Sequence, residues 1–202
     1  MGYEASKRAS DGEVAEGSVG AGTGATVGKL YELQRASKGG LGTASRRGPG
    51  RLVVGALAVV NSFGDVLDPV TGSLLAGLRD SPSGRRLTST MELLRKGIRK
   101  ERFGTLPLQN TTLVVMATNA SLTKTETTKL AQMASGGLFR TLSPYGSLFD
   151  GDVIFALSTG EVDADLHNIA PLAQEAVAEA VKRAVVKADG FGLLPAYRDL
   201  ER

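Results

Sequence analysis

Three short apolar runs, separated by helical patterns, constrain the fold of this 202-residue chain most strongly. They cover residues 52–60, 113–117 and 153–157. Runs of this length, rich in Val, Leu and Ala, are typical of β-strands, and the near-continuous first run predicts a strand buried on both faces. Residues 61–88 are rich in Gly, Pro, Asp and Ser, which predicts a loop after the first strand.

Helical signals lie between and after these strands. The predicted helices cover residues 3–10, about 90–101, 123–136 and about 168–188, and a short linker covers residues 102–110. Ser89 with Glu92, and Thr123 with Glu126, have the spacing of capping boxes at helix starts. The glycine pair at residues 136–137 is predicted to end the third helix. Strands mixed with helices indicate an α/β or α+β domain.

The composition excludes several classes of protein. The chain has no cysteine, so disulfides, thiolate metal sites and cysteine nucleophiles are absent. Its single histidine, His167, makes a multi-histidine metal site or a Ser-His-Asp triad hard to build. No apolar run approaches the ~20 residues of a membrane span, and no signal-peptide pattern is present. We therefore expect a cytoplasmic protein with no membrane partner, no cofactor and no metal.

The charge is small overall but unevenly placed. Residues 1–110 hold 16 Lys/Arg and 10 Asp/Glu, a net charge of +6, whereas residues 111–202 have a net charge of −3. Opposite charges on the two halves fit halves that pack together better than they fit a nucleic-acid-binding domain. Residues 79–102, with eight Lys/Arg and three Asp/Glu, would fit a phosphate-binding patch, but a solvated helix face explains them better.

A glycine-rich stretch at residues 16–29 invites a nucleotide-binding interpretation, which fails on detail. A P-loop would need Gly at Thr23 and Ser or Thr at Leu30. The spacing of residues 20–25 fits a dinucleotide fingerprint, but no apolar strand precedes it. The stretch therefore predicts a tight loop that leaves the charge of Lys29 at the end of a compact turn.

Two further short motifs are ambiguous on their own. Asn110 and Thr111 stand just before the second strand, where loop chemistry is common. Asp150 and Asp152 flank Gly151 just before the third strand. Two carboxylates so close would fit a solvated turn, a shared proton, a bound cation or an oriented amine.

Taken together and in order, these motifs resemble the DmpA-type peptidase family, which includes D-aminopeptidases, β-aminopeptidases and nylon-oligomer hydrolases. The resemblance runs from residue 1 to about residue 187 and rests on five segments: residues 20–29, 38–45, 59–65, 110–120 and 149–159. It implies a four-layer α-β-β-α sandwich of the type shared with ornithine acetyltransferases, and a homo-oligomer, often a tetramer.

The resemblance also implies self-processing. The precursor would cut itself between Asn110 and Thr111 into residues 1–110, the C-terminal part of a larger (α) chain, and residues 111–202, the smaller (β) chain. The two chains together would form one sandwich domain. Thr111 would then be the N-terminal nucleophile that hydrolyses small peptides or amide oligomers through an acyl-threonine intermediate.

The resemblance places Lys29, Asn61, Asp150 and Asp152 around Thr111. A threonine hydroxyl needs a base, and the free α-amine, with a reference pKa of about 8, can serve. Lys29 would lower the pKa of this amine by repulsion, whereas the two aspartates would raise it and orient the amine. The side-chain amide of Asn61 would donate to the developing oxyanion.

Two alternatives stay open. Ornithine acetyltransferases also use a threonine nucleophile and cut themselves, but they have Lys-Gly where this chain has Gln109 and Asn110. Family precursors carry an N-terminal segment ahead of the region where this chain begins. We therefore expect an N-terminally truncated sandwich, or an inactive fragment, with exposed sheet edges and apolar surface and with poor solubility alone.

Overall fold

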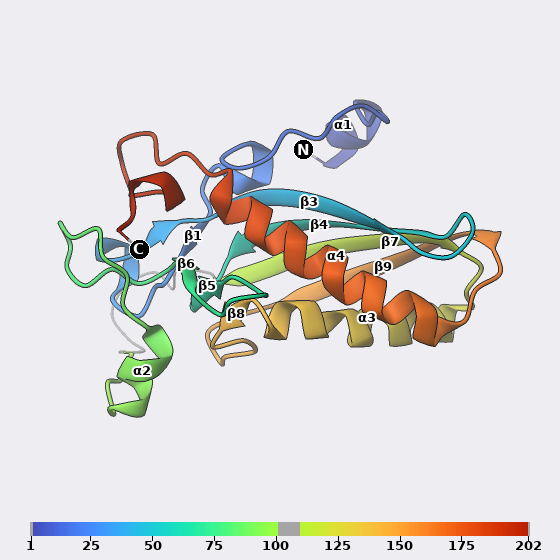
Figure 1. Ribbon diagram of the computed structural model, residues 1–202. Helices are drawn as coiled ribbons and strands as arrows, with labels where there is room; N and C mark the ends of the chain where they lie inside the picture. Colours follow the sequence, from blue (N-terminus) through green and yellow to red (C-terminus); the bar gives the residue numbers. More distant parts are fainter. Residues whose placement is uncertain (1, 101–109, 202) are drawn as a thin grey trace.

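A four-stranded sheet organises the computed structural model, which describes residues 2–100 and 110–201 (Figure 1). The order across this main sheet is β3 (Gly40–Arg47), β4 (Val53–Asn61), β7 (Thr111–Ala120) and β9 (Val153–Val162). β4 is antiparallel to both of its neighbours, whereas β7 and β9 are parallel. Helix α3 (Lys124–Phe139) joins these two parallel strands, which a short turn could not connect. The chain thus has the expected mixed α/β fold.

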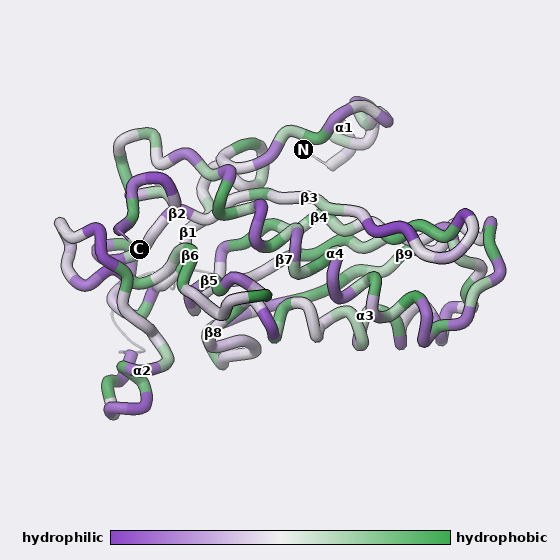
Figure 2. The backbone as a smooth tube through the Cα atoms, in the orientation of Figure 1, coloured by the Kyte–Doolittle hydropathy of each residue, from purple (hydrophilic) through white to green (hydrophobic). Residues whose placement is uncertain are grey.

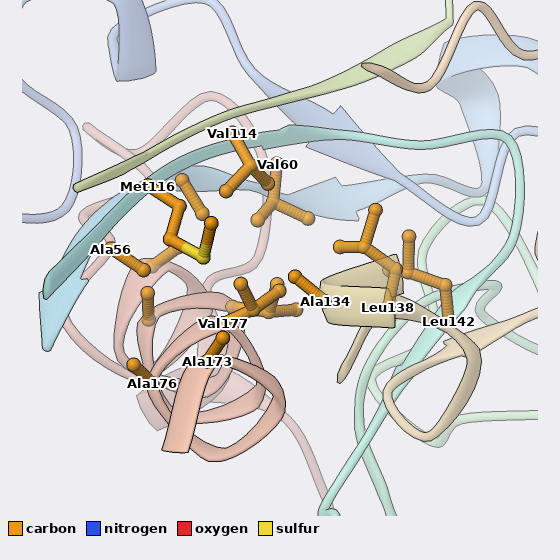
Figure 3. Packing of buried hydrophobic residues seen from close by; sticks show 14 of the residues in the cluster. Ala56, Val60, Val114, Met116, Ala134, Leu138, Leu142, Ala173, Ala176 and Val177 are labelled. Atoms are coloured by element: carbon orange, nitrogen blue, oxygen red, sulfur yellow. The ribbon is translucent and has the colours of Figure 1, made fainter. Parts of the chain in front are cut away.

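Helices α3 and α4 (Leu166–Val186) lie together on one face of the main sheet (Figure 1). Figure 3 shows the core between them, built from Ala56, Val60, Val114 and Met116 of the sheet and from Ala134, Leu138, Ala173, Ala176 and Val177 of the helices. Small residues let the layers approach closely, since a Cβ at Gly42 would lie 2.2 Å from the carbonyl oxygen of Ala180. The described residues therefore supply one helix layer and one sheet layer of the expected sandwich.

Strand β4 is buried on one face, which corrects the prediction of two buried faces. Val54, Ala56, Ala58 and Val60 are buried, and the residues between them are half-buried. The alternation arises because successive side chains of a strand point to opposite sides of the sheet, and the two helices cover one side.

The opposite side, which we call the outer sheet face, consists of Leu113, Val115, Val153, Phe155 and Leu157. These side chains are 36–57% exposed, although they are apolar and lie side by side on β7 and β9. Figure 2 shows hydrophobic positions running along the strands of the main sheet. A contiguous apolar area of this kind is typical of a contact surface. A second sheet of the expected sandwich would pack on this side.

Shorter elements surround one end of the main sheet (Figure 1). They are β1 (Thr26–Val27), β2 (Ser37–Lys38), β5 (Asp65–Leu67), β6 (Leu74–Ala76), α2 (Thr90–Arg95) and β8 (Leu142–Ser143). The short helix α1 (Gly2–Lys7) lies apart from them. β5 and β6 correct the prediction of a plain loop over residues 61–88. A local pattern could not find them, because β5 also pairs with the distant β8. Residues 102–109 of the predicted linker lie outside the described part of the chain, and Asn110 lies within it.

The helix starts follow the sequence signals, but three helix ends do not, and α1 ends at Lys7 instead of residue 10. The side chains of Ser89 and Thr123 cap α2 and α3 as predicted. α2 ends at Arg95, earlier than expected, just before Gly97 with its φ of +86°. α3 continues through the predicted stop to Phe139. Gly137 has a packing role instead, because a Cβ there would lie 2.5 Å from the carbonyl oxygen of Gln174. Gly136 and Gly137 thus serve the close packing of α3 against α4. No helix that the structure describes is both long and apolar enough to cross a membrane.

Candidate active site

The main sheet brings the motif residues together at one of its ends. Asn61, the last residue of β4, lies directly opposite Thr111, the first residue of β7, in the antiparallel ladder. On the other side of β7, Asn110 forms a parallel bridge with Asp150 just before β9 begins. Ladder register therefore sets these segments side by side, although they lie far apart along the chain.

The Asn110–Thr111 peptide is held from several sides. The hydroxyl of Thr111 donates to the carbonyl oxygen of Asn110 at 2.5 Å, and the backbone N–H of Gly151 donates to the same oxygen at 3.0 Å. The side-chain amide of Asn110 donates to the carbonyl oxygen of Phe149 at 3.1 Å. Asn110 is buried, whereas Thr111 is half-buried, so the hydroxyl lies at the edge of the packed region.

Lys29 reaches the site through the turn that follows β1. Its backbone N–H donates to the carbonyl oxygen of Phe63 at 2.8 Å, and that of Gly28 donates to Gly64 at 2.9 Å. Gly28 has a φ of +75°, and a Cβ there would lie 2.0 Å from the nitrogen of Leu78. The glycine stretch thus permits close backbone approach, as the sequence predicted, and it places Lys29 beside Asn61.

The side chain of Lys29 is buried and fixes the side chain of Asn61. Its ammonium donates to the main-chain oxygen of Asn61 at 2.9 Å and to the side-chain oxygen at 2.8 Å. The same side-chain oxygen accepts from the N–H of Thr26 at 3.0 Å, which leaves the amide nitrogen on the opposite side of the group. Burial lowers the pKa of Lys29 to about 8, and the nearby charge of Asp150 partly offsets this effect.

The two aspartates are anchored by backbone and hydroxyl donors. Asp150 accepts from the N–H of Phe63 at 2.8 Å and from the hydroxyl of Ser147 at 2.6 Å. Asp152 accepts from the N–H of Thr112 at 2.7 Å, and its other oxygen is buried with no hydrogen-bond partner among the described residues. Burial raises the pKa of Asp152, and the charge of Asp150 adds to that rise.

Sequence reasoning missed Lys100, a neighbour of this cluster. The ammonium of Lys100 donates to the carbonyl oxygen of Lys29 at 2.8 Å and to Glu32 at 2.5 Å. It also lies 5.5 Å and 5.9 Å from the ring centroids of Phe63 and Phe149, within reach of cation–π attraction. Lys100 belongs to the basic stretch considered as a phosphate patch, and no local signal distinguishes it there.

Arg79, in the same basic stretch, is buried and donates to backbone carbonyls, those of Ala36 and Pro82 among them. The guanidinium of Arg79 thus stabilises the fold and is not exposed for binding to a polyanion. In the part of the chain that the structure describes, no group of three His, Cys, Asp or Glu side chains could hold a metal ion. The arrangement has the components of nucleophilic chemistry: a hydroxyl, a buried lysine, an amide and two carboxylates.

Comparison with known proteins places the chain among peptidases. Residues 1–192 match the sequence profile of peptidase family S58. An uncharacterized aminopeptidase of Mycobacterium leprae (strain TN) is 34% identical over 216 residues, which cover 96% of this chain and 55% of the relative. A 6-aminohexanoate-oligomer endohydrolase of Kocuria sp. is 28% identical over 163 residues, which cover 81% of this chain and 45% of the relative. The chain thus spans about half the length of the curated relatives it matches.

Solved structures agree with this similarity. The L-aminopeptidase D-Ala-esterase/amidase of Ochrobactrum anthropi, described as a variant of the Ntn-hydrolase fold, matches with a TM-score of 0.63 and 26% identity. That match covers 93% of this chain and 49% of the other. A β-aminopeptidase of Burkholderia sp. matches with a TM-score of 0.58 and 28% identity, over 92% of this chain and 50% of the other.

Proposed function

Because the chain belongs to peptidase family S58, we propose that it is a self-cleaving N-terminal-nucleophile hydrolase. It cuts between Asn110 and Thr111 and then hydrolyses small peptides or amide oligomers through an acyl-threonine intermediate. The observation that carries this proposal is the ladder register that sets Thr111 opposite Asn61 and next to the segment of Asp150. The names of the relatives, aminopeptidase and oligomer endohydrolase, support the substrate class.

The proposed chemistry assigns a base to a weak nucleophile. Cleavage frees the α-amine of Thr111, whose reference pKa of about 8 suits proton transfer from the hydroxyl near neutral pH. Lys29 lowers the pKa of this amine by repulsion, and the carboxylates of Asp150 and Asp152 orient it. The bridge between Asn110 and Asp150 and the hydrogen bond from the N–H of Thr112 to Asp152 support this role, because they hold both aspartates on either side of Thr111.

Asn61 is proposed to stabilise the oxyanion of the substrate. Its side-chain oxygen is occupied by Lys29 and Thr26, so the amide group has one defined orientation. A hydrogen-bond donor whose orientation is already fixed stabilises the transition state more than a donor that must reorganise during the reaction. A tetramer-type homo-oligomer stays a prediction from the resemblance, and a cytoplasmic location stays a prediction from the composition.

Denaturing gels and intact-mass measurement test the self-cleavage. The wild-type chain is expected to yield two fragments that meet between Asn110 and Thr111. Thr111→Ala should stay whole, Thr111→Ser should still cut, and Thr128→Ala, which removes an exposed hydroxyl on α3, should cut like the wild type. A wild-type chain that stays whole on long incubation contradicts the proposal. Release of amino acids from D-, β- and 6-aminohexanoyl amides then identifies the substrate.

A further inference from the structure

We infer that the backbone N–H of Gly151 is the oxyanion donor for cleavage of the Asn110–Thr111 bond. This inference rests on the proposed function and names a catalytic group beyond Lys29, Asn61, Thr111, Asp150 and Asp152, the residues to which the resemblance assigns a role. The nitrogen of Gly151 lies 3.0 Å from the carbonyl oxygen of Asn110 and its N–H donates to that oxygen, on which the negative charge develops when the carbonyl carbon is attacked.

The donor is held in place by the main sheet. β7 and β9 pair in parallel from Leu113 and Val153 onward, and the bridge between Asn110 and Asp150 extends the same register to the scissile bond. The hydrogen bond from the N–H of Gly151 to the carbonyl oxygen of Asn110 thus belongs to this parallel ladder, at its end. A donor fixed by ten-residue strands needs no reorganisation when negative charge develops on the oxygen that it contacts.

The reaction needs a donor at this oxygen. The Oγ of Thr111 forms a bond to the carbonyl carbon of Asn110, and the carbonyl oxygen becomes an oxyanion. The C–N bond then breaks, and the proton lost by the hydroxyl ends on the nitrogen of Thr111. Water hydrolyses the resulting ester, which gives the carboxylate of Asn110 and restores the hydroxyl. Attack by the hydroxyl and attack by water each form a tetrahedral intermediate at the carbonyl carbon of Asn110. In both intermediates the negative charge lies on an oxygen bonded to that carbon.

A side chain at this position would crowd the nucleophile. A Cβ at Gly151 would lie 3.2 Å from the Oγ of Thr111 and 3.9 Å from the carbonyl oxygen of Asn110. The flanking carboxylates are held by other groups, Asp150 by the N–H of Phe63 and Asp152 by the N–H of Thr112. The Asp-Gly-Asp motif therefore has two distinct components: acids that anchor the turn, and a glycine whose N–H meets the scissile carbonyl.

Replacing one backbone amide by an ester tests this inference. Glycolic acid in place of Gly151 removes the N–H and keeps the shape of the chain. The matched control places the hydroxy analogue of leucine at Leu67, whose N–H donates to Thr141 at 2.8 Å away from the site. We expect the Gly151 ester to cut about 10²–10³-fold more slowly than wild type, and the Leu67 ester to cut at a near wild-type rate.

The outcomes separate the two proposals. If the wild type cuts and the Gly151 ester cuts equally fast, or if both esters are slowed alike, the Gly151 inference is overturned and the proposed function stands. If the wild type never cuts, the proposed self-cleavage is overturned and this inference with it. Should the Gly151 ester fail to fold, the uncut Thr111→Ala chain supplies a second measurement. A scalar coupling across the bond from Gly151 N to Asn110 C′ is expected by NMR, and its absence overturns the inference.

Discussion

The ammonium of Lys29 donates to both oxygens of Asn61, the main-chain carbonyl and the side-chain amide, at 2.9 Å and 2.8 Å. A single buried cation thus sets the orientation of the residue that lies opposite Thr111 in the ladder. The pKa of Lys29 therefore reports on the environment of this part of the site.

Lys29→Met should remove a pH dependence of stability. The pKa of Lys29 is about 8 in the folded chain and 10.5 ordinarily, so the unfolded chain binds more protons between these pH values. Stability due to this residue therefore rises with pH across that window, by up to about 3 kcal/mol. Urea unfolding at about pH 7.5 and pH 10.5 should show this rise in the wild type and not in Lys29→Met. An identical pH dependence in both chains would contradict the assignment.

Lys100→Met should raise the pKa of Lys29. The charge of Lys100 lies close enough to lower that pKa, and methionine keeps the apolar stem against Phe63 and Phe149 while removing the charge. NMR titration of the lysine side chains measures the shift. Lys96→Met, at an exposed position after α2, is the matched control and should leave the pKa of Lys29 unchanged.

Gly28→Ala should destabilise the fold, whereas Gly24→Ala should not. Gly28 has a φ of +75° and a Cβ there would lie 2.0 Å from the nitrogen of Leu78, so alanine forces a backbone shift. We expect a loss of at least about 1–3 kcal/mol in the free energy of unfolding. Gly24 has open space around it, and alanine there should change stability by less than about 1 kcal/mol. Equal effects at both positions would refute the close-approach explanation of the glycine stretch.

Polar substitutions on the outer sheet face should reduce self-association of the chain. Phe155→Thr and Leu157→Thr replace side chains that are 57% and 54% exposed, so stability should change by less than about 1 kcal/mol. Dye binding to apolar surface and sedimentation should both fall relative to the wild type. Phe139→Thr, which changes an exposed apolar residue at the end of α3, is the control and should alter neither measurement. Unchanged association in the two sheet variants would show that this face is not a contact surface.

The sequence by itself determined most of the long strands and two helix starts. Apolar runs marked β4, β7 and β9, three of the four strands of the main sheet, and the capping signals at Ser89 and Thr123 marked two helix starts. Such signals depend on residues within a turn or two of each other, so a linear pattern contains them. The resemblance supplied Lys29, Asn61 and the two aspartates as a set, without their geometry.

Only the tertiary structure decided how distant segments meet. The register of β4 against β7 sets Asn61 opposite Thr111, and the extension of β9 brings the N–H of Gly151 to the carbonyl oxygen of Asn110. The contact of Lys100 with Lys29 and the passage of α3 through Gly137 likewise depend on neighbours far along the chain. Hydrogen-bond ladders and close packing join residues by position in space, and no local pattern records that position.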